Sequence, residues 1–152
     1  MVDTAPSEGW TLSSLTELFA SDPDGLAEVD VSVSGDALRV TLMERGGLDV
    51  LIAAAGDQVL ASVLMLPADD VPDRAGFERT LLTVHKLIPL STFGITTVDG
   101  REWYELFGSL SAHSDPAAMV HEVAVLAANA VDAAEWVQEW IARGGANEEQ
   151  AA

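Results

Sequence analysis

The chain has no cysteine among its 152 residues and only 7 basic residues, of which Lys86 is the single lysine. The absence of cysteine excludes disulfides, thiolate metal sites and cysteine nucleophiles. Because 25 residues are acidic, the formal net charge is -18. A surface this negative repels phosphate groups, so the composition argues against binding of nucleic acid and against electrostatic docking on an anionic membrane.

The same charge has two interpretations. It keeps the protein soluble, or it attracts a basic partner. The first eight residues carry no positive start and no apolar run of the kind found in secretory signals. No stretch reaches 18 uninterrupted apolar residues, so no membrane insertion is expected. We therefore expect a cytoplasmic protein.

Length and pattern predict one domain. A chain of 152 residues has the size of a single domain and can bury a substantial core. Residues 1–9 are interpreted as a disordered lead-in, residues 10–143 as one α+β domain, and residues 144–152 as an acidic tail. No repeat or linker interrupts the middle range.

The first half predicts one helix and four strands. A helix is expected over Thr11–Ser21, capped by Thr11 or Ser13, with Ser14 and Glu17 as a capping box. Four apolar alternations with short glycine turns then favour an antiparallel meander. They are Val29, Val31 and Val33; Leu38, Val40 and Leu42; Leu48, Val50 and Ile52; and the run Val59–Leu66. The last run is apolar on both faces, so it is expected to be central or to be covered by a partner.

The second half predicts a helix, a hairpin and a long helix. The helix is expected to start at Asp69 or Asp70, with Pro72 in its first turn, and to stop at Pro89. Asp99-Gly100 indicates a type I′ turn between strands Thr92–Val98 and Arg101–Leu110. Ser114 is then expected to cap a helix over about Asp115–Arg143. The order is α-ββββ-α-ββ-α, an α+β fold in which a four-strand meander and a later hairpin form an antiparallel sheet packed with three helices.

The segment Leu66-Pro67-Ala68-Asp69, together with His85 to Ile95, resembles the YjfI-like family of bacterial proteins, a family of unknown function. The stretch Pro89-Leu90-Ser91-Thr92-Phe93-Gly94 is its most distinctive part. The similarity covers about residues 10–140. The element order also resembles the fold of type III secretion chaperones. The resemblance implies an envelope-stress or accessory role near a phage-shock-protein-A-like partner, and it implies no catalytic residue.

The histidines do not form a metal site by spacing. No two of His85, His113 and His121 are three or four residues apart on a helix. No nucleophile elbow, phosphate loop or dinucleotide fingerprint occurs. We therefore expect no enzyme, no cofactor and no bound metal.

Asp69, Asp70 and Asp73 cluster where the second helix is expected to begin. A cation site is one interpretation of this cluster. Capping and complementarity with the helix dipole explain the same residues without a ligand, and this is the favoured interpretation.

The long third helix has two apolar stripes where a surface helix needs one. The first consists of Val120, Val123, Ala127, Ala130, Ala134, Val137 and Ile141. The second consists of Ala133, Trp136 and Trp140. Either the helix is deeply buried, or the tryptophans meet a partner, since tryptophan is common at binding hot spots.

Three aromatic residues of the last hairpin, Trp103, Tyr104 and Phe107, are expected to belong to the core and the sheet surface. Trp103 and Phe107 would join this candidate interface if they lie at an exposed edge. The leading hypothesis is therefore a non-catalytic, chaperone-like accessory module that binds another protein or a second copy of itself. The alternative is a domain that binds a small regulatory ligand between the sheet and the third helix.

Overall fold

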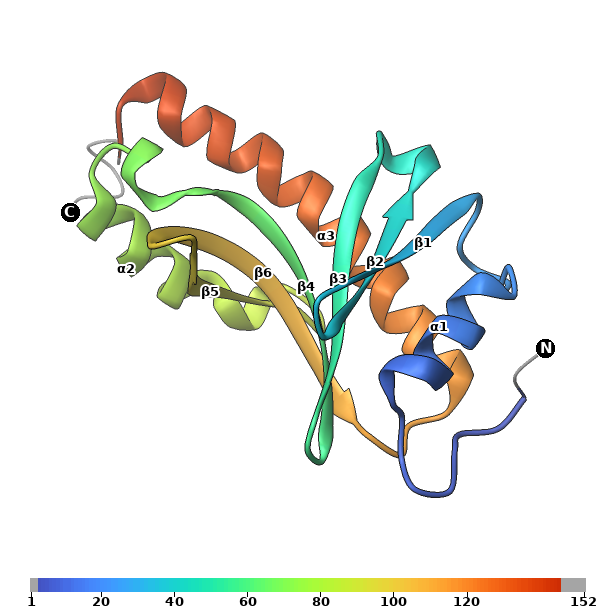
Figure 1. Ribbon diagram of the computed structural model, residues 1–152. Helices are drawn as coiled ribbons and strands as arrows, with labels where there is room; N and C mark the ends of the chain where they lie inside the picture. Colours follow the sequence, from blue (N-terminus) through green and yellow to red (C-terminus); the bar gives the residue numbers. More distant parts are fainter. Residues whose placement is uncertain (1–2, 146–152) are drawn as a thin grey trace.

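The computed structural model describes residues 3–145 and has the element order expected from the sequence. Three helices and a six-stranded antiparallel sheet form an α+β fold (Figure 1). The strand order across the sheet is β1-β2-β3-β4-β6-β5. The lead-in and tail predicted at the chain ends fall partly outside the described residues, namely at 1–2 and 146–152.

Helix α1, Leu12–Ala20, is held at its start by Thr11. The Thr11 hydroxyl accepts a hydrogen bond from the Ser14 amide, and the Ser14 hydroxyl accepts one from the Thr11 amide. The expected box of Ser14 and Glu17 is therefore wrong, because Ser14 is already the third helical residue. The buried side chains of α1 pack on strands β1, Val29–Ser34, and β2, Ala37–Leu42.

The first four strands form a meander in which apolar residues share one face. Val31 lies opposite Val40, and Val40 lies opposite Val50. Strand β3, Leu48–Ala55, then pairs with β4, Gln58–Pro67. Strand β4 lies between β3 and β6, so the prediction that it is central is confirmed.

Strands β5, Thr92–Val98, and β6, Arg101–Ser111, form the later hairpin. Asp99 and Gly100 both have positive φ, 50° and 78°, as a type I′ turn requires. The expected turn is therefore confirmed. Its strands extend the sheet beyond β4 on the side opposite the meander.

Helix α2, Arg74–Val84, starts later than the sequence predicts. Its cap is Asp73, whose carboxylate accepts a hydrogen bond from the Gly76 amide. Asp69 and Asp70 instead lie in a 3₁₀ turn, η2, Ala68–Asp70, and Pro72 precedes the cap. The helix ends in a second 3₁₀ turn, η3, His85–Leu87.

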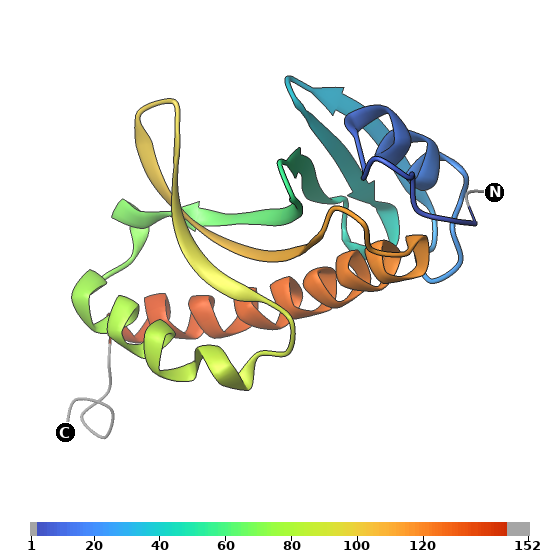
Figure 2. The same cartoon turned by 90° about the horizontal axis from the view of Figure 1, so that it is seen from below.

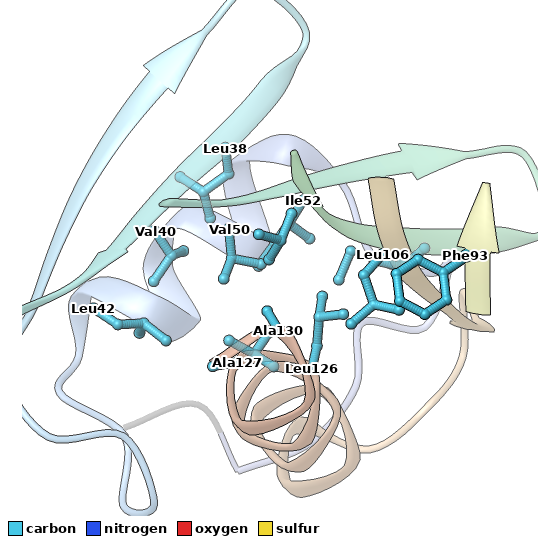
Figure 3. Packing of buried hydrophobic residues seen from close by; sticks show 14 of the residues in the cluster. Leu38, Val40, Leu42, Val50, Ile52, Phe93, Leu106, Leu126, Ala127 and Ala130 are labelled. Atoms are coloured by element: carbon cyan, nitrogen blue, oxygen red, sulfur yellow. The ribbon is translucent and has the colours of Figure 1, made fainter. Parts of the chain in front are cut away.

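Helix α3, Pro116–Arg143, is the central element of the core. Its cap position is Asp115, one residue after the expected Ser114. Its first residue is Pro116, which is tolerated there because a backbone N–H at this position would have no intrahelical acceptor. Figure 2 shows α3 running along the sheet, with α1 near its first turns and α2 beside its last turns. Figure 3 shows side chains of the sheet pointing toward Leu126, Ala127 and Ala130.

By length and composition alone, α3 is apolar enough to cross a membrane, over Pro116–Ala142. In this fold the apolar residues of α3 are explained by packing within the protein. They pack against the sheet in the first half of the helix and against α2 in the second half. The sequence criterion of uninterrupted apolar residues missed this helix, because isolated charged residues interrupt it.

The three helices cover the same face of the sheet. Leu106 and Tyr104 of β6 are buried on the helix side, as are Val59, Ala61 and Val63 of β4. The alternate residues of these strands therefore face away from the helices. This second face has no covering layer among the described residues.

Candidate functional site

Trp140 is fully buried, with an exposed fraction of 0%. Its indole nitrogen donates a hydrogen bond of 2.8 Å to the carbonyl of Pro72, and its ring lies 5.5 Å from that of Phe77. The prediction that Trp140 meets a partner is therefore wrong. The end of α3 is covered by α2, a layer that helical periodicity alone did not reveal.

Trp136 is half-buried and stacks on Phe77 at a ring distance of 5.4 Å. Together with Ala133 it borders an open groove of about 420 Å³ between α3 and the segment after α2. Part of the predicted tryptophan surface therefore remains accessible. The expected apolar stripe also shifts, because Ile141 is exposed and Leu126 is buried.

Trp103 and Phe107 lie elsewhere. They alternate along β6 with the buried Tyr104 and Leu106, so they belong to the face that the helices leave open. The five residues of the predicted interface are thus divided between two faces of the sheet. The prediction that they form one site is wrong, since the sheet lies between Phe107 and Trp136.

Two of the polar residues singled out in the sequence, His85 and Asp70, have structural partners. The His85 ring nitrogen Nε2 accepts a hydrogen bond of 3.2 Å from the amide of Phe93 at the outer edge of β5. Asp70 forms an ion pair of 3.3 Å with Arg101. Over residues 3–145, no group of three or more histidine, aspartate or glutamate side chains is arranged to hold a metal ion.

An ionic cluster joins α2 to the hairpin. Arg74 donates to Glu78 at 2.8 Å and to Glu102 at 2.9 Å, and the Tyr104 hydroxyl donates to Glu78 at 2.9 Å. Arg74 lowers the pKa of Glu78, while burial and the bond to Glu78 raise the pKa of Tyr104 to about 12. Each charged group in this cluster is hydrogen-bonded to a neighbour, so the cluster has a structural role and holds α2 against the hairpin.

Glu122 is the exception, a buried carboxylate with 5% of its surface exposed. Its Oε1 atom has no hydrogen-bond partner among the described residues and lies against Gly108 of β6, where a side chain would collide with it. Burial raises the pKa of Glu122, and nearby His121 offsets part of that rise. The carboxyl lies against the backbone of β6, and Glu122 is not among the residues that line the open grooves along α3.

An open feature of the fold lies where β3 and β4 separate. The two strands pair from Ala55 and Gln58 up to Leu51 and Ser62. Beyond that point residues 48–50 pair with β2 alone, and residues 63–67 pair with β6 alone, with a bulge between Leu64 and Leu66. Figure 1 shows the two strands diverging, with α3 crossing behind the opening.

This opening forms a groove of about 630 Å³. Its apolar walls include Val63 of β4 and the small residues Ala130 and Ala134 of α3. Glu135 and Glu139 line it as well, and its lining contains no basic residue. We call this feature the β3–β4 groove. It combines apolar surface, acidic side chains and strand backbone that lacks a partner on one side.

Sequence reasoning missed the β3–β4 groove but held a signal for it. The run Val59–Leu66 is apolar on both faces, which raised the alternative that a partner covers one of them. Divergence of two strands depends on twist and on the bulge near Met65, which alternation of residue types does not encode. Ala134, a member of the first apolar stripe of α3, is exposed and lines the groove.

A single six-stranded antiparallel sheet with three helices on one face defines a small α+β domain with an open groove. The chain belongs to the bacterial family described as "Uncharacterized protein conserved in bacteria (DUF2170)", whose model matches residues 9–141. It is 29% identical over 131 residues to "Uncharacterized protein YjfI" of Escherichia coli K12, covering 86% of this chain and 97% of that protein. The same values hold for YjfI of Escherichia coli O157:H7. The YjfI-like membership predicted from the sequence is therefore confirmed.

A solved structure supports the fold. The chain is similar to the crystal structure of YbjN from E. coli, a proposed transcription regulator, with a TM-score of 0.60 and 15% identity. The alignment covers 88% of this chain and 93% of YbjN. Identity at this level shows a shared α+β architecture and nothing about a shared activity.

Proposed function

We propose that this protein is a non-catalytic accessory module that binds another protein, and that the β3–β4 groove is its docking site. The observation that carries the proposal is the separation of β3 from β4 over an apolar floor. Strand backbone without a partner is a known template for pairing with another chain. Most proteins cover or shorten such borders, so an open one inside a sheet favours a binding role.

The groove favours a polypeptide over a small molecule. Pockets for small ligands are concave and enclose most of the ligand, with a few convergent polar groups. The β3–β4 groove is open along one side, and its polar lining consists of Glu135, Gln138 and Glu139 near its rim. An elongated partner fits this geometry better than a small regulatory ligand does.

The wider role follows from resemblance and composition. The chaperone-like order of elements and the net charge of -18 support a cytoplasmic protein that holds another polypeptide. The resemblance to the YjfI-like family implies an accessory role in envelope stress, with a phage-shock-protein-A-like protein as the partner to test first. The relation to YbjN supports the architecture only.

A photo-crosslinking amino acid placed at residue 134 tests the docking site in the native host. Ala134 is exposed and lines the groove, while Ala75 on α2 is exposed and lies outside it. We expect a defined protein adduct from position 134 and none from position 75. The purified partner should then lose affinity for the Ala134→Trp variant and keep it for Ala75→Trp.

Two results would contradict the proposal. One is a partner whose affinity is unchanged by Ala134→Trp, because a bulky ring at that position fills the groove. The other is native mass spectrometry of the purified protein that finds a stoichiometric small molecule which Ala134→Trp displaces. Circular dichroism of both variants checks that they remain folded.

A further inference from the structure

We infer that the occupant of the β3–β4 groove is an extended segment of a partner protein with alternating apolar and basic side chains, which adds a strand beside residues 63–67 of β4. This inference rests on the proposed function and specifies the chemistry of the partner. Backbone pairing, side-chain packing and charge each support it separately.

The backbone of β4 supports strand addition. Over residues 58–62 this strand has neighbours on both sides, but over residues 63–67 it pairs with β6 only. Each unpaired N–H or C=O group near an apolar floor costs free energy unless a partner or water satisfies it. An extended chain lying between β4 and β3 would supply those partners over about 17 Å, the length of five strand residues.

The other strand borders of the sheet are less suited to this. The outer edge of β5 is partly closed, since His85 accepts the hydrogen bond of the Phe93 amide. The outer edge of β1 is six residues long and bears Asp30, Ser32 and Ser34. A groove of about 260 Å³ also lies beside Phe93, Gly94 and Ile95 of β5. The border at residues 63–67 lies beside the wider β3–β4 groove of about 630 Å³ and has no strand on that side among the described residues.

The floor of the groove sets the apolar half of the pattern. Side chains of an extended chain alternate between two directions, so every second one would point toward α3. There they would meet Ala130 and Ala134, whose small size leaves room for branched aliphatic side chains. The intervening side chains would point outward, on the side of the sheet that the helices leave open.

Charge sets the other half. Glu135 and Glu139 are exposed at the groove, and its lining offers no basic residue to neutralise them. On the open face, Glu105 lies across from Leu64, with its Oε1 near Gly94, and its desolvation raises its pKa. Glu135 and Glu139 lie on the α3 side of the groove, and Glu105 lies on the open face one strand beyond β4. These carboxylates would therefore attract the lysine or arginine side chains of an occupant through their field, without a direct ion pair.

The same charges argue against a second copy as the occupant. Two molecules would bring two acidic rims together, each on a chain with a net charge of -18. Like charges placed face to face disfavour association, whereas a basic segment is attracted over a long range. The proposed occupant is therefore a basic partner segment, and self-association through this groove is an outcome that the test below detects.

The inference is tested with synthetic ten-residue peptides and fluorescence anisotropy at physiological salt. The probes are an alternating lysine–valine peptide, an alternating glutamate–valine peptide, and a lysine–valine peptide of the same composition in blocks. A fourth probe carries N-methyl groups on alternate residues of the first, which removes backbone donors. We expect the first to bind, the second not to bind, and the third and fourth to bind about tenfold more weakly.

Variants locate the binding. Ala134→Trp should abolish it and Ala75→Trp should not. The double variant Glu135→Gln with Glu139→Gln should weaken it about tenfold and reduce its salt dependence. Glu8→Gln with Glu17→Gln makes the same change in net charge at exposed positions outside the groove and should leave affinity unchanged.

The inference would be overturned if the alternating and block peptides bound equally well, or if Ala134→Trp left the affinity unchanged. Either result would show nonspecific attraction to an acidic protein. Dimerisation that Ala134→Trp prevents would overturn it as well. The proposed function fails separately. It survives if the partner that crosslinks at residue 134 docks a helical or acidic segment there, and in that case only the inferred chemistry is wrong.

Discussion

At the scale of single residues, Trp140 makes a hydrogen bond to Pro72 that the sequence did not predict. Its ring is buried and its nitrogen donates to the Pro72 carbonyl. Trp140→Phe keeps an aromatic ring but leaves that carbonyl without its donor, so we expect unfolding free energy to fall by about 1–3 kcal/mol in urea titrations. Trp136→Phe is the matched control and should cost less, since Trp136 is half-exposed. Equal losses would mean that the bond to Pro72 contributes nothing.

Glu122 gives a pH prediction. Burial raises its pKa above the ordinary value of 4.5, so the folded state holds the proton more tightly than the unfolded chain does. Stability from this group is therefore complete below pH 4.5 and is lost as pH rises through the raised pKa. Glu122→Gln should be more stable than the parent at pH 7, with the gain vanishing toward pH 4. Thermal melts across that range decide it, and a loss at pH 7 would show that the charged carboxylate has a partner.

Tyr104 can be observed directly, because it is the only tyrosine in the chain. Its tyrosinate absorption should appear with a midpoint at about 12 while the protein is folded. Glu78→Gln should lower that midpoint, since Glu78 is the acceptor of the phenol proton. Glu102→Gln, which touches Arg74 but not the phenol, serves as control. A midpoint at the ordinary value of 10 in the folded parent would contradict the described bond.

At the scale of elements, features set by the local sequence could be predicted, whereas features set by tertiary packing could not. The alternation of β2 and β3 and the Asp99-Gly100 turn are local signals, and both are confirmed. The start of α2 was placed too early because three aspartates could each cap a helix, and only the position of Asp73 relative to Gly76 settles which one does. Such a choice depends on where the chain lies after Pro67.

The candidate site was less predictable than the fold. Trp136 and Trp140 were grouped by helical spacing, but α2 covers the second of them. Trp103 and Phe107 were grouped with them as aromatics, but strand alternation places them across the sheet. The β3–β4 groove arises from divergence of two strands that are paired at one end only, a property of the sheet as a whole.

At the scale of the whole molecule, the excess of negative charge is the main feature that affects stability. The chain has 25 acidic residues and 7 basic ones, so most carboxylates have no cation to pair with. Added salt should screen their repulsion and raise stability between low and physiological ionic strength, by about 1 kcal/mol or ~3 °C in melting temperature. Calorimetry in a salt series measures this. A flat or falling midpoint would mean that the charges are too widely spread to repel.

The central claim is that β4 has an unpaired border at residues 63–67 which a partner strand completes. Of these residues, Pro67 has no amide proton. Amide hydrogen exchange resolved by residue tests it most directly. In the free protein, alternate amides of residues 63–66 should exchange faster than those of residues 59–62, which have neighbours on both sides. Adding the alternating lysine–valine peptide should slow those amides and leave the amides of β1 unchanged. Equal protection along all of β4 in the free protein, or no slowing on binding, would contradict the account.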